Sequence, residues 1–532
     1  MTRWAMVADL ERCVGCQTCT AACRHANATS PAVQWRKVLD VEAGSFPNVH
    51  RTFVPVGCQH CSDPPCMHVC PSTATRQRPD GIVTIDYDIC IGCAYCDVAC
   101  PYQARFKIDK EDFAYGDRAT QNELERENDL LKRIGVAQKC TFCSDRIDFG
   151  IANGIAPGSD PRATPACVNA CIADALHFGD LDDPGSNVSQ LLRRHKNFRM
   201  HAELKTEPGF YYLYDKADAP PAPDIPPAVA DTQAGRIRTR GVEPWHQKHW
   251  DWKAAGNFLC GGAGAGLFAC ATLVGLNGTP VVLPGLAALL LVALGLGLLL
   301  FKIGRPLRFL YVMRQPRRSW MTREAWVVCL WYPVGLFALW SNHAQFLLPA
   351  AVIGLAFLFC QGMILEQAKG IPAWRTPRVI ALIMATGLAE GCGLLLLIAV
   401  FSPNLAYAAQ PMAILLIALA TGRVWTWWRY LGALETEGAP TRTLEVFDAC
   451  RVWFFAGGLA LPLVLVGAGL LLAAASGALF ALAGVAVFCS GWAVKYILIT
   501  RAAYNQGFAL PHTPIRGSGV PGPAVKPGWT LP

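Results

Sequence analysis

The sequence predicts a protein of two halves that differ in fold class: a cysteine-rich α+β domain over residues 1–215 and an all-α bundle of eight transmembrane helices over residues 251–510. Two observations carry this prediction. Sixteen of the 23 cysteines fall before residue 215, and apolar runs long enough to cross a bilayer follow one another after residue 250. A Pro- and Ala-rich stretch within residues 216–250 predicts a linker, and residues 511–532 are expected to form a cytoplasmic tail.

The net charge of +8 is compatible with binding to nucleic acid or to anionic lipid. Its distribution favours lipid, because the Lys and Arg residues gather beside the apolar runs, and no nucleic-acid partner is expected. The first thirteen residues contain no apolar h-region and no twin-arginine pair, so we expect no export signal.

The cysteines of the first half form four groups with repeated spacing. The groups are Cys13, Cys16, Cys19, Cys23; Cys58, Cys61, Cys66, Cys70; Cys90, Cys93, Cys96, Cys100; and the split group Cys140, Cys143, Cys167, Cys171. A tight C-x-x-C-x-x-C loop can hold three corners of a cubane iron–sulfur cluster, while a fourth cysteine, three residues further on, ligates a second cluster. Sixteen thiolates therefore predict four clusters, with motifs that work in pairs and a fold with internal pseudo-symmetry.

Disulfides and zinc are the alternatives. A disulfide framework is unexpected without an export signal. Zinc sites favour two separated pairs of ligands, and only the fourth group has that form. Ile82, Val83 and Ile85 precede the third group and predict a short strand that caps its loop.

Residues 1–215 resemble the four-cluster iron–sulfur subunit of the dimethyl-sulfoxide-reductase family of molybdenum enzymes. The resemblance is carried by "CVGCQTCTAAC", "CQHCSDPPCMHVCP", "CIGCAYCDVACPY" and "KCTFCSDR…PACVNAC". It implies a ferredoxin-like double repeat in which motif one pairs with motif four and motif two with motif three. The implied ligand sets are Cys13, Cys16, Cys19, Cys171; Cys140, Cys143, Cys167, Cys23; Cys90, Cys93, Cys96, Cys70; and Cys58, Cys61, Cys66, Cys100. Some relatives lack one cysteine of the third motif, but Cys93 is present here, so four [4Fe–4S] clusters are expected.

Eight apolar runs are predicted to span the membrane. They cover residues 255–275, 281–301, 325–342, 344–364, 379–401, 409–428, 452–474 and 478–499. Five Lys or Arg residues precede the first span, seven lie within residues 302–324, and the later loops on that side hold three each, whereas the opposite loops hold none. The positive-inside rule therefore places both termini and the cysteine domain in the cytoplasm, at a bacterial inner membrane.

No haem is expected in this anchor. Membrane cytochromes ligate haem through histidines on spanning helices. None of the eleven histidines falls inside a predicted span, and only His343 lies in a loop on the far side.

The second half resembles the eight-helix anchor subunit of the same enzyme family, and is most similar to that of cytoplasmic sulfite:quinone oxidoreductases. The residues that carry this are "KIGRPLRFL", "RRSWMTREAW" and "PAWRTP". Many relatives have His where this chain has Lys302, at a position that lies beside the quinone in the family. A lysine there can donate a hydrogen bond, but it is less suited than histidine to relay a proton at neutral pH.

Candidate quinone-binding residues gather at the cytoplasmic rim: Trp245, His246, His249, Trp250, Lys302, Arg305, Trp320 and Glu324. An interfacial belt is the alternative, because Trp and Arg at helix ends anchor many membrane proteins without a ligand. Arg305 is also a candidate to dock the cysteine domain. Lys302 and Glu324 flank one loop, and we expect them to line the quinone site beside the cluster of Cys58, Cys61, Cys66 and Cys100.

Three charged residues fall deeper in the predicted spans: Glu390, Arg423 and Lys495. A charge at mid-bilayer costs roughly 2.5–3.5 kcal/mol on insertion scales, so these residues are functional candidates. Arg423 and Lys495 lie toward cytoplasmic ends and can snorkel. The seven cysteines of this half have no ligand spacing and are interpreted as small apolar fillers.

These features predict a redox subunit that passes electrons between a catalytic chain and quinone. Nothing in the sequence resembles a pterin-binding domain, so a separate molybdopterin-containing subunit, with molybdenum or tungsten, is expected to carry out the substrate chemistry. We expect motifs one and four to face that partner and motifs two and three to face the membrane. Electron flow from a cytoplasmic substrate such as sulfite to quinone is favoured. Reverse flow to sulfoxide, polysulfide or tetrathionate is an alternative, and an ion-translocating module of a larger respiratory complex is another.

Overall fold

The computed structural model describes residues 2–45, 48–116, 122–127, 130–216, 238–240, 242–515 and 522–529. The chain forms two compact units, which we call the cysteine unit (Met1–Trp245 with Asn505–Leu531) and the helical unit (His246–Tyr504). The Pro- and Ala-rich stretch Asp218–Asp231 predicted as the linker lies outside the described residues, as does part of the expected tail. The structure groups residues 505–515 and 522–529 with the cysteine unit. In this part of the chain, the carbonyl oxygen of Gly507 lies 3.1 Å from His201 Nε2.

The cysteine unit is built around a four-stranded mixed sheet in the order β8-β1-β10-β9. Strand β1 (Trp4–Asp9) pairs in parallel with β10 (Phe210–Lys216) and antiparallel with β8 (Leu176–Asp180), and β9 (His195–Phe198) completes the sheet. Every residue of β1 is buried, as expected for a central strand covered on both faces. Helix α7 (Asn187–Arg194) places Val188 against Val7 and Leu213 on one face.

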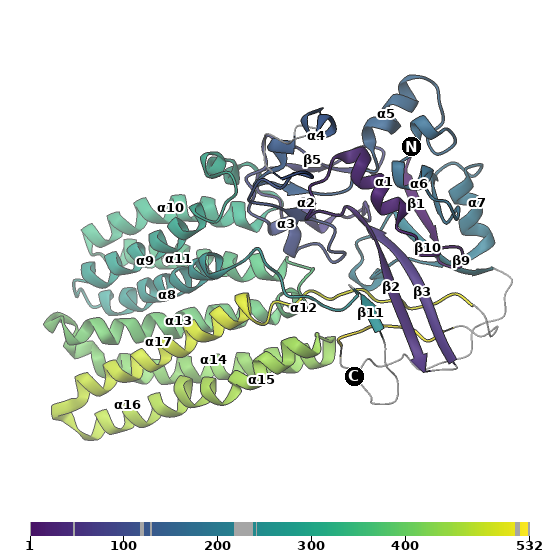
Figure 1. The fold of residues 1–532 in the computed structure, drawn as a ribbon. Coiled ribbons are helices and arrows are strands. Elements are labelled where there is room, and N and C mark those ends of the chain that lie inside the picture. The colour runs from purple at the N-terminus through teal and green to yellow at the C-terminus, as the bar shows by residue number, and fades with distance from the viewer. Residues whose placement is uncertain are drawn as a thin grey trace. The chain divides into compact units, whose positions relative to one another are not determined.

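A long antiparallel pair, β2 (Arg36–Ser45) and β3 (Asn48–Gly57), extends from this unit and is joined by β11 (Arg238–Arg240) (Figure 1). Two short pairs lie near the cysteine loops: β4 (Thr75–Gln77) with β5 (Val83–Ile85), and β6 (Phe106–Lys107) with β7 (Ala137–Gln138). The strand predicted before the third cysteine group is therefore present as β5.

Short helices follow the cysteine loops. They are α1 (Thr18–Asn27), α2 (Pro65–His68), α3 (Tyr95–Val98), α5 (Ser144–Ala152) and α6 (Ala166–Asn169), and α4 (Glu123–Glu127) lies between the third and fourth groups. The first and third loops repeat the same backbone turn. Gly15 and Gly92 both have φ near +70°, and Gln17 and Ala94 both adopt the left-handed conformation just before the helix. At Gly15 a Cβ atom would lie 2.4 Å from Phe53 Cδ1, so this turn requires glycine.

In the described part of the chain, eight helical segments are long and apolar enough to cross a membrane: Trp252–Gly275, Val282–Leu300, Trp320–Ser341, Ala344–Glu366, Arg378–Val400, Pro403–Glu437, Thr441–Leu471 and Ala473–Thr500. They contain helices α8 (Trp252–Gly275), α9 (Val282–Leu300), α10 (Trp320–Ser341), α11 (Ala344–Glu366), α13 (Arg378–Val400), α14 (Ala409–Glu437), α15 (Thr441–Phe455), α16 (Leu461–Leu471) and α17 (Ser476–Thr500). The short helix α12 (Pro372–Arg375) precedes α13. The all-α bundle predicted for this half is confirmed. The sixth and seventh segments are longer than predicted, because α14 continues to Glu437 and α15 begins at Thr441, beyond the apolar runs.

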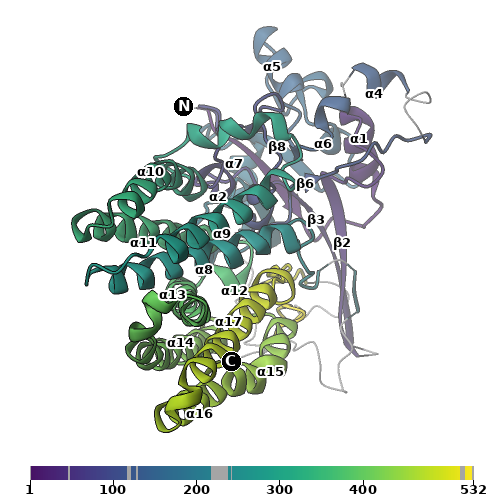
Figure 2. The ribbon, with the colours of Figure 1, turned by 90° about the vertical axis from the view of Figure 1, so that its left-hand side faces the viewer.

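The helices lie side by side, and α13 packs against both α8 and α17 (Figure 2). Helix α8 is the most enclosed and crosses α13 closely. A Cβ atom at Gly266 would lie 1.9 Å from the carbonyl oxygen of Gly387, and Gly391 meets the backbone of Gly266 in the same way. Small residues at a crossing let two helix backbones approach, which is the usual way membrane helices gain packing contacts. A π-helical turn, Ala456–Ala460, interrupts the seventh segment between α15 and α16.

Candidate functional site

The structure gathers the sixteen cysteines of the first half into four sets, each of which takes three residues from one motif and one from the paired motif. Set 1 is Cys13, Cys16, Cys19 and Cys171, and these four line one hollow. Burial raises the pKa of Cys19 to about 11; Arg36 opposes the rise, and the thiolates of Cys167, Cys13 and Cys171 add to it. Cys16 is the exposed member of this set.

Set 2 is Cys23, Cys140, Cys143 and Cys167. Burial raises the pKa of Cys23 well above its ordinary value, and the thiolates of the other three members add to the rise. Asn27, on the last turn of α1, directs its Nδ2 toward Cys23 Sγ at 3.8 Å and Cys143 Sγ at 3.7 Å. One side-chain amide thus contacts two members that lie 120 residues apart in the sequence.

Set 3 is Cys58, Cys61, Cys66 and Cys100, and set 4 is Cys70, Cys90, Cys93 and Cys96. Burial raises the pKa of Cys61 well above its ordinary value, with contributions from the other members of set 3. The pKa of Cys96 is raised in the same way by burial and, against the opposing charge of Arg105, by the other members of set 4. In each set, the four cysteines therefore lie close enough for the charge of one thiolate to affect the pKa of another.

The sets follow one another in a series. Set 1 is next to set 2, because the charge of Cys167 in set 2 helps to raise the pKa of Cys19 in set 1. Set 2 is next to set 3, because Cys58 acts on Cys140, whose pKa burial raises to about 12. Arg105 lies between sets 3 and 4, with its strongest interactions at Cys66 and Cys96. Set 4 therefore stands at the far end of the series from set 1.

Backbone amides point at several of the sulfurs. The amides of Ala175, Thr75 and Phe142 donate to Cys171 Sγ at 3.2 Å, Cys70 Sγ at 3.5 Å and Cys140 Sγ at 3.4 Å. Such donors stabilise thiolates and the clusters that thiolates ligate. Among the described residues, no three His, Cys, Asp or Glu side chains converge closely enough to hold a single metal ion.

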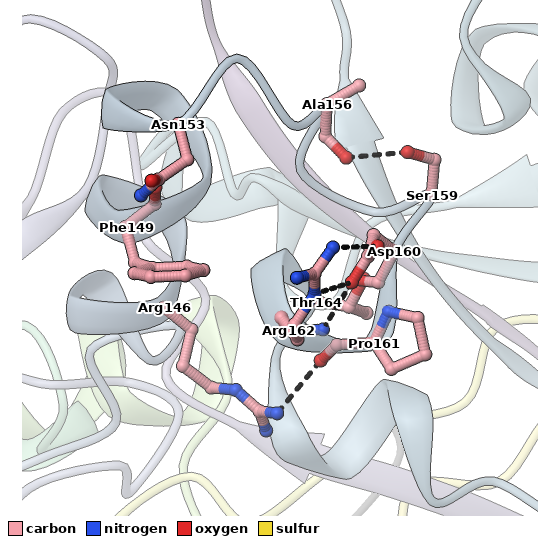
Figure 3. A network of polar contacts seen from close by, with 9 residues as sticks. All are labelled: Arg146, Phe149, Asn153, Ala156, Ser159, Asp160, Pro161, Arg162 and Thr164. Atoms are coloured by element: carbon pink, nitrogen blue, oxygen red, sulfur yellow. Dashed lines mark hydrogen bonds and ion pairs between the residues drawn. The ribbon is translucent and has the colours of Figure 1, made fainter.

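The loop that carries the split fourth motif is fixed by local polar contacts (Figure 3). Arg146 on α5 donates to the carbonyl oxygen of Pro161 at 2.8 Å, and Thr164 Oγ1 donates to the carbonyl oxygen of Asp160 at 2.7 Å. A Cβ atom at Gly150 would lie 2.5 Å from that of Ala163, so this side of α5 packs directly on the returning chain. These contacts hold the segments that bear Cys143 and Cys167 at a fixed separation.

The charge balance of the cysteine unit fits bound iron–sulfur clusters. Arg36 is 1% exposed, and its Nε and Nη1 atoms have no hydrogen-bond partner in the described structure. A buried guanidinium of this kind requires a nearby anion. Sets 1 and 2, once they hold clusters through thiolates, would supply it.

In the helical unit, the predicted rim residues fall into separate groups. Lys302 Nζ lies 3.6 Å from Asp251 Oδ2, before the start of α8. Trp250 packs on Trp374 with ring centroids 5.3 Å apart. His246 contacts Tyr504 edge to face, and burial lowers its pKa.

Of the remaining rim residues, Trp320 contacts Phe359 edge to face at 5.7 Å. His249 and Arg305 are half-buried, and Arg305 precedes the 3₁₀ segment Pro306–Arg314. Trp245 belongs to the cysteine unit, where the Lys37 ammonium lies 4.7 Å from its ring centre.

Glu324 lies deeper, in a buried polar cluster formed by three helices. Asn257 Nδ2 on α8 donates to Glu324 Oε1 on α10 at 3.5 Å, and Gln361 Nε2 on α11 donates to the carbonyl oxygen of Asn257 at 3.0 Å. All three residues are at most 3% exposed, and Asn257 Oδ1 and Gln361 Oε1 have no hydrogen-bond partner in the described structure. Sequence reasoning missed Asn257 and Gln361; their signal was an amide side chain inside an otherwise apolar run.

The three deep charges meet. Lys495 Nζ lies 2.5 Å from Glu390 Oε2, and a Cβ atom at Gly491 would contact both Glu390 Oε1 and Arg423 Nη1. Arg423 donates to the carbonyl oxygens of Val487 and, in the π-helical turn, Gly458, both at 2.8 Å. All three charged side chains are at most 1% exposed, so none snorkels as the sequence had suggested for Arg423 and Lys495.

Comparison with known proteins finds a family model that matches each half of the chain. Residues 49–116 match the family model of a 4Fe-4S dicluster domain, and residues 243–505 match that of Polysulphide reductase, NrfD. Over 227 residues the chain is 41% identical to a selenate reductase subunit of Mesobacillus selenatarsenatis, a match that covers 40% of this chain and 72% of the relative. A sulfite dehydrogenase subunit of Allochromatium vinosum is 37% identical (40% of this chain, 83% of the relative), and a tetrathionate reductase subunit of Salmonella typhimurium is 38% identical (40% and 72%).

Proposed function

Because the chain belongs to the family of iron–sulfur subunits of molybdoenzyme complexes, fused here to an NrfD-type membrane anchor, we propose that it carries electrons between a pterin-containing catalytic subunit and quinone in the lipid phase. Electron transfer within a membrane-bound oxidoreductase complex is the shared role of this family, and the eight apolar helices make the chain a multi-pass membrane protein. We propose, in addition, that the electron acceptor is quinone, that the partner contains a pterin, and that the substrate is the one named below.

The observation that carries the proposal is the series of four cysteine sets in a chain that continues into a membrane anchor. We propose that each set holds one [4Fe–4S] cluster, which supplies a one-electron carrier when bound. Set 1 is suited to exchange electrons with the catalytic partner, because Val14 and Ile172 beside it are 57% and 74% exposed. Apolar side chains exposed beside a redox centre are available to contact a partner protein. Set 4, at the opposite end of the series, would exchange electrons with quinone.

For the substrate and direction, we propose oxidation of a cytoplasmic substrate such as sulfite with reduction of quinone. Relatives include a sulfite dehydrogenase subunit and several reductase subunits, so similarity alone favours neither direction. The location of Lys and Arg in the loops on one side of the bundle supports a cytoplasmic cysteine unit at a bacterial inner membrane, and such a unit would meet cytoplasmic substrates.

For the quinone, we propose a site that uses Glu324 with Asn257 and Gln361, near the Lys302 end of the anchor. The unsatisfied amide oxygens beside a buried carboxylate provide polar groups inside an apolar bundle, as a quinone site needs. No haem ligand is required for this route.

Affinity purification of the full chain from its native membranes tests the proposal. A pterin-containing subunit should copurify, and the complex should reduce a water-soluble quinone analogue when sulfite is added. Oxidation of reduced quinone by tetrathionate or selenate, with no response to sulfite, would show that electrons flow in the reverse direction. The proposed route between the catalytic subunit and quinone would then still hold. A complex without any pterin would contradict the proposal.

Ion translocation is a second candidate function, favoured by the buried Glu390–Lys495 pair and its contact with Arg423. Charges at this depth commonly mark ion or proton routes. Proteoliposomes that contain the whole complex should then acidify or alkalise their lumen during turnover, and Glu390→Gln should abolish that change while quinone reduction continues. A signal equal in wild type and variant would dismiss this function.

A further inference from the structure

Three cations lie buried among the cysteine sets: Arg36, Arg105 and Lys139 are each at most 3% exposed. The opposite charges that act most strongly on them are cysteine thiolates and not carboxylates. Taking a cation out of water is costly unless an anion lies close by, so the folded protein must compensate three such charges.

Arg36 lies between sets 1 and 2. The thiolates that act on it are Cys167, Cys140, Cys19 and Cys23. Its Nη2 atom lies 2.9 Å from Met6 Sδ and its guanidinium carbon 4.9 Å from the centre of the Phe210 ring. Opposite Arg36 on β3 stands Gly57, where a Cβ atom would lie 3.2 Å from Nη1. The surroundings of Arg36 thus fit a guanidinium closely, and among the described residues they include no carboxylate partner.

Lys139 lies between sets 2 and 3. Its Nζ atom donates to the carbonyl oxygen of Cys140 at 2.6 Å and to that of Val83. The thiolates that act on it are Cys58, Cys140 and Cys66. This cation therefore donates a hydrogen bond to the backbone of Cys140 in set 2 and also interacts electrostatically with Cys58 and Cys66 in set 3.

Arg105 lies between sets 3 and 4. Its Nη2 atom donates to Cys66 Sγ at 2.8 Å, and its Nη1 atom to Thr75 Oγ1 at 3.0 Å. Thr75 in turn gives its backbone amide to Cys70 Sγ of set 4. Arg105 therefore contacts a sulfur of set 3 directly and is one residue away from a sulfur of set 4.

His60 lies close to the second of these cations, Lys139. Its ring stacks on Phe142 at 3.7 Å, and its Nδ1 atom accepts a hydrogen bond from the amide of Val83 at 3.1 Å. Val83 also accepts a hydrogen bond from Lys139 Nζ through its carbonyl oxygen, so His60 is one residue away from that cation. One positive charge thus lies at each junction between successive sets.

We infer that Arg36, Lys139 and Arg105 act as fixed counter-charges that raise the reduction potentials of the two sets that each one joins. The inference rests on the proposed function, since it requires that the sets hold clusters. The potential of an iron–sulfur cluster depends on net charge, on hydrogen bonds to its sulfurs and on solvent exposure. An added electron makes a cluster more negative, so a nearby cation favours reduction. Because each cation is shared, an electron that passes between two sets remains in the field of the same charge.

The test is a redox titration of the full chain, purified anaerobically in detergent and followed by electron paramagnetic resonance. The variants are Arg36→Met, Lys139→Met and Arg105→Met, which keep an unbranched apolar stem and remove the charge, with Arg36→Lys as the charge-conserving form. Arg78→Met is the matched control, because Arg78 is already paired with Asp80 and Asp148. Signals are assigned beforehand with Cys16→Ser for set 1 and Cys93→Ser for set 4.

Arg36→Met should lower the midpoint potentials of sets 1 and 2 by at least about 59 mV, which corresponds to a tenfold change in a one-electron equilibrium constant. The potential of set 4 should change less, and Arg36→Lys should stay close to wild type. Arg105→Met should act on sets 3 and 4 and spare set 1. Full iron content with unchanged potentials, or an equal shift of all signals, would overturn the inference.

Iron analysis covers the case in which a variant loses clusters. Loss of sets 1 and 2 in Arg36→Met but not in Arg36→Lys supports a need for the charge, whereas equal loss in both overturns it, because shape would then be the requirement. If wild-type protein holds no clusters in these sets, the proposed function fails first, and the two failures are distinguished.

Discussion

Lys495 Nζ lies 2.5 Å from Glu390 Oε2, with the two side chains supplied by α17 and α13 and neither more than 1% exposed. Lys495 also donates to the carbonyl oxygen of Phe258 on α8, at 2.9 Å. One ammonium therefore ties together three helices that are far apart in the sequence.

Removing one member of this pair should be costly. Lys495→Met leaves the Glu390 carboxylate buried without its partner, and such a loss typically destabilises a protein by about 3–5 kcal/mol. In thermal unfolding in detergent, the midpoint temperature should be clearly lower for Lys495→Met and for Glu390→Gln than for wild type. The double variant should lose less stability than the sum of the two single losses. Lys248→Met is the control, since Lys248 is exposed. Additive effects would mean that the two residues do not stabilise each other.

The cluster content follows from the four sets. Anaerobically purified protein should contain about sixteen irons and about sixteen acid-labile sulfides per chain, four of each per cubane. Iron analysis and sulfide analysis of the same sample measure this. A reproducible value near half of that, with cluster loss during purification excluded, contradicts four clusters.

Cys93→Ser should damage set 4 alone. Its neighbours Cys70, Cys90 and Cys96 place it within that set, so about four irons should be lost or one signal altered. Cys329→Ser is the matched control, because Cys329 is an exposed cysteine of the helical unit. Loss of a second signal would indicate that set 4 supports the folding of another set.

Much of this architecture could be predicted from the sequence, for physical reasons that differ between the halves. Cysteine spacing is dictated by cluster geometry, so the groups around Cys13 and Cys90 could be identified from spacing alone, and β5 followed from its β-branched residues. The apolar runs are long enough to specify the helices, because the bilayer sets a minimum length. These signals are local in the chain.

What could not be predicted depends on contacts between distant segments. Arg36 looks like any charged residue at the start of a strand, and only the fold brings it to Cys140 and Cys167, more than 100 residues away. Asn257 and Gln361 are isolated amides with no spacing to connect them. The order of the sets, which places set 4 at the end, likewise depends on three-dimensional neighbours.

The orientation of the chain can be tested with a reporter that is active only in the periplasm. Fused after Pro532, it should be silent; inserted within residues 402–408, it should be active, because those loops lack Lys and Arg. A reporter active only in the cytoplasm, placed at the same two points, is the control and should give the opposite readings. The reverse pattern would move the cysteine unit to the periplasm and remove the preference for a cytoplasmic substrate.

The last prediction concerns quinone. Lys302 contacts Asp251, and Glu324 contacts Asn257. Asp251 and Asn257 are six residues apart in the sequence, or about 9 Å along a helix, so Lys302 and Glu324 contact the same segment of the chain. A carboxylate at this point can supply protons that quinone reduction consumes. A lysine nearer the rim can donate to a quinone oxygen or to the carboxylate of Asp251.

Glu324→Gln keeps the shape and the hydrogen bond to Asn257 but cannot exchange a proton, so quinone turnover should slow by roughly a hundredfold. Reduction of the clusters by substrate should be unchanged in the same preparation, which separates a quinone defect from a folding defect. Glu366→Gln, at the end of α11, is the matched control and should behave as wild type. Lys302→Ala should weaken quinone binding and raise the KM for quinone. If both rates persist in Glu324→Gln and in Lys302→Ala, these residues only anchor the bundle and the quinone binds elsewhere.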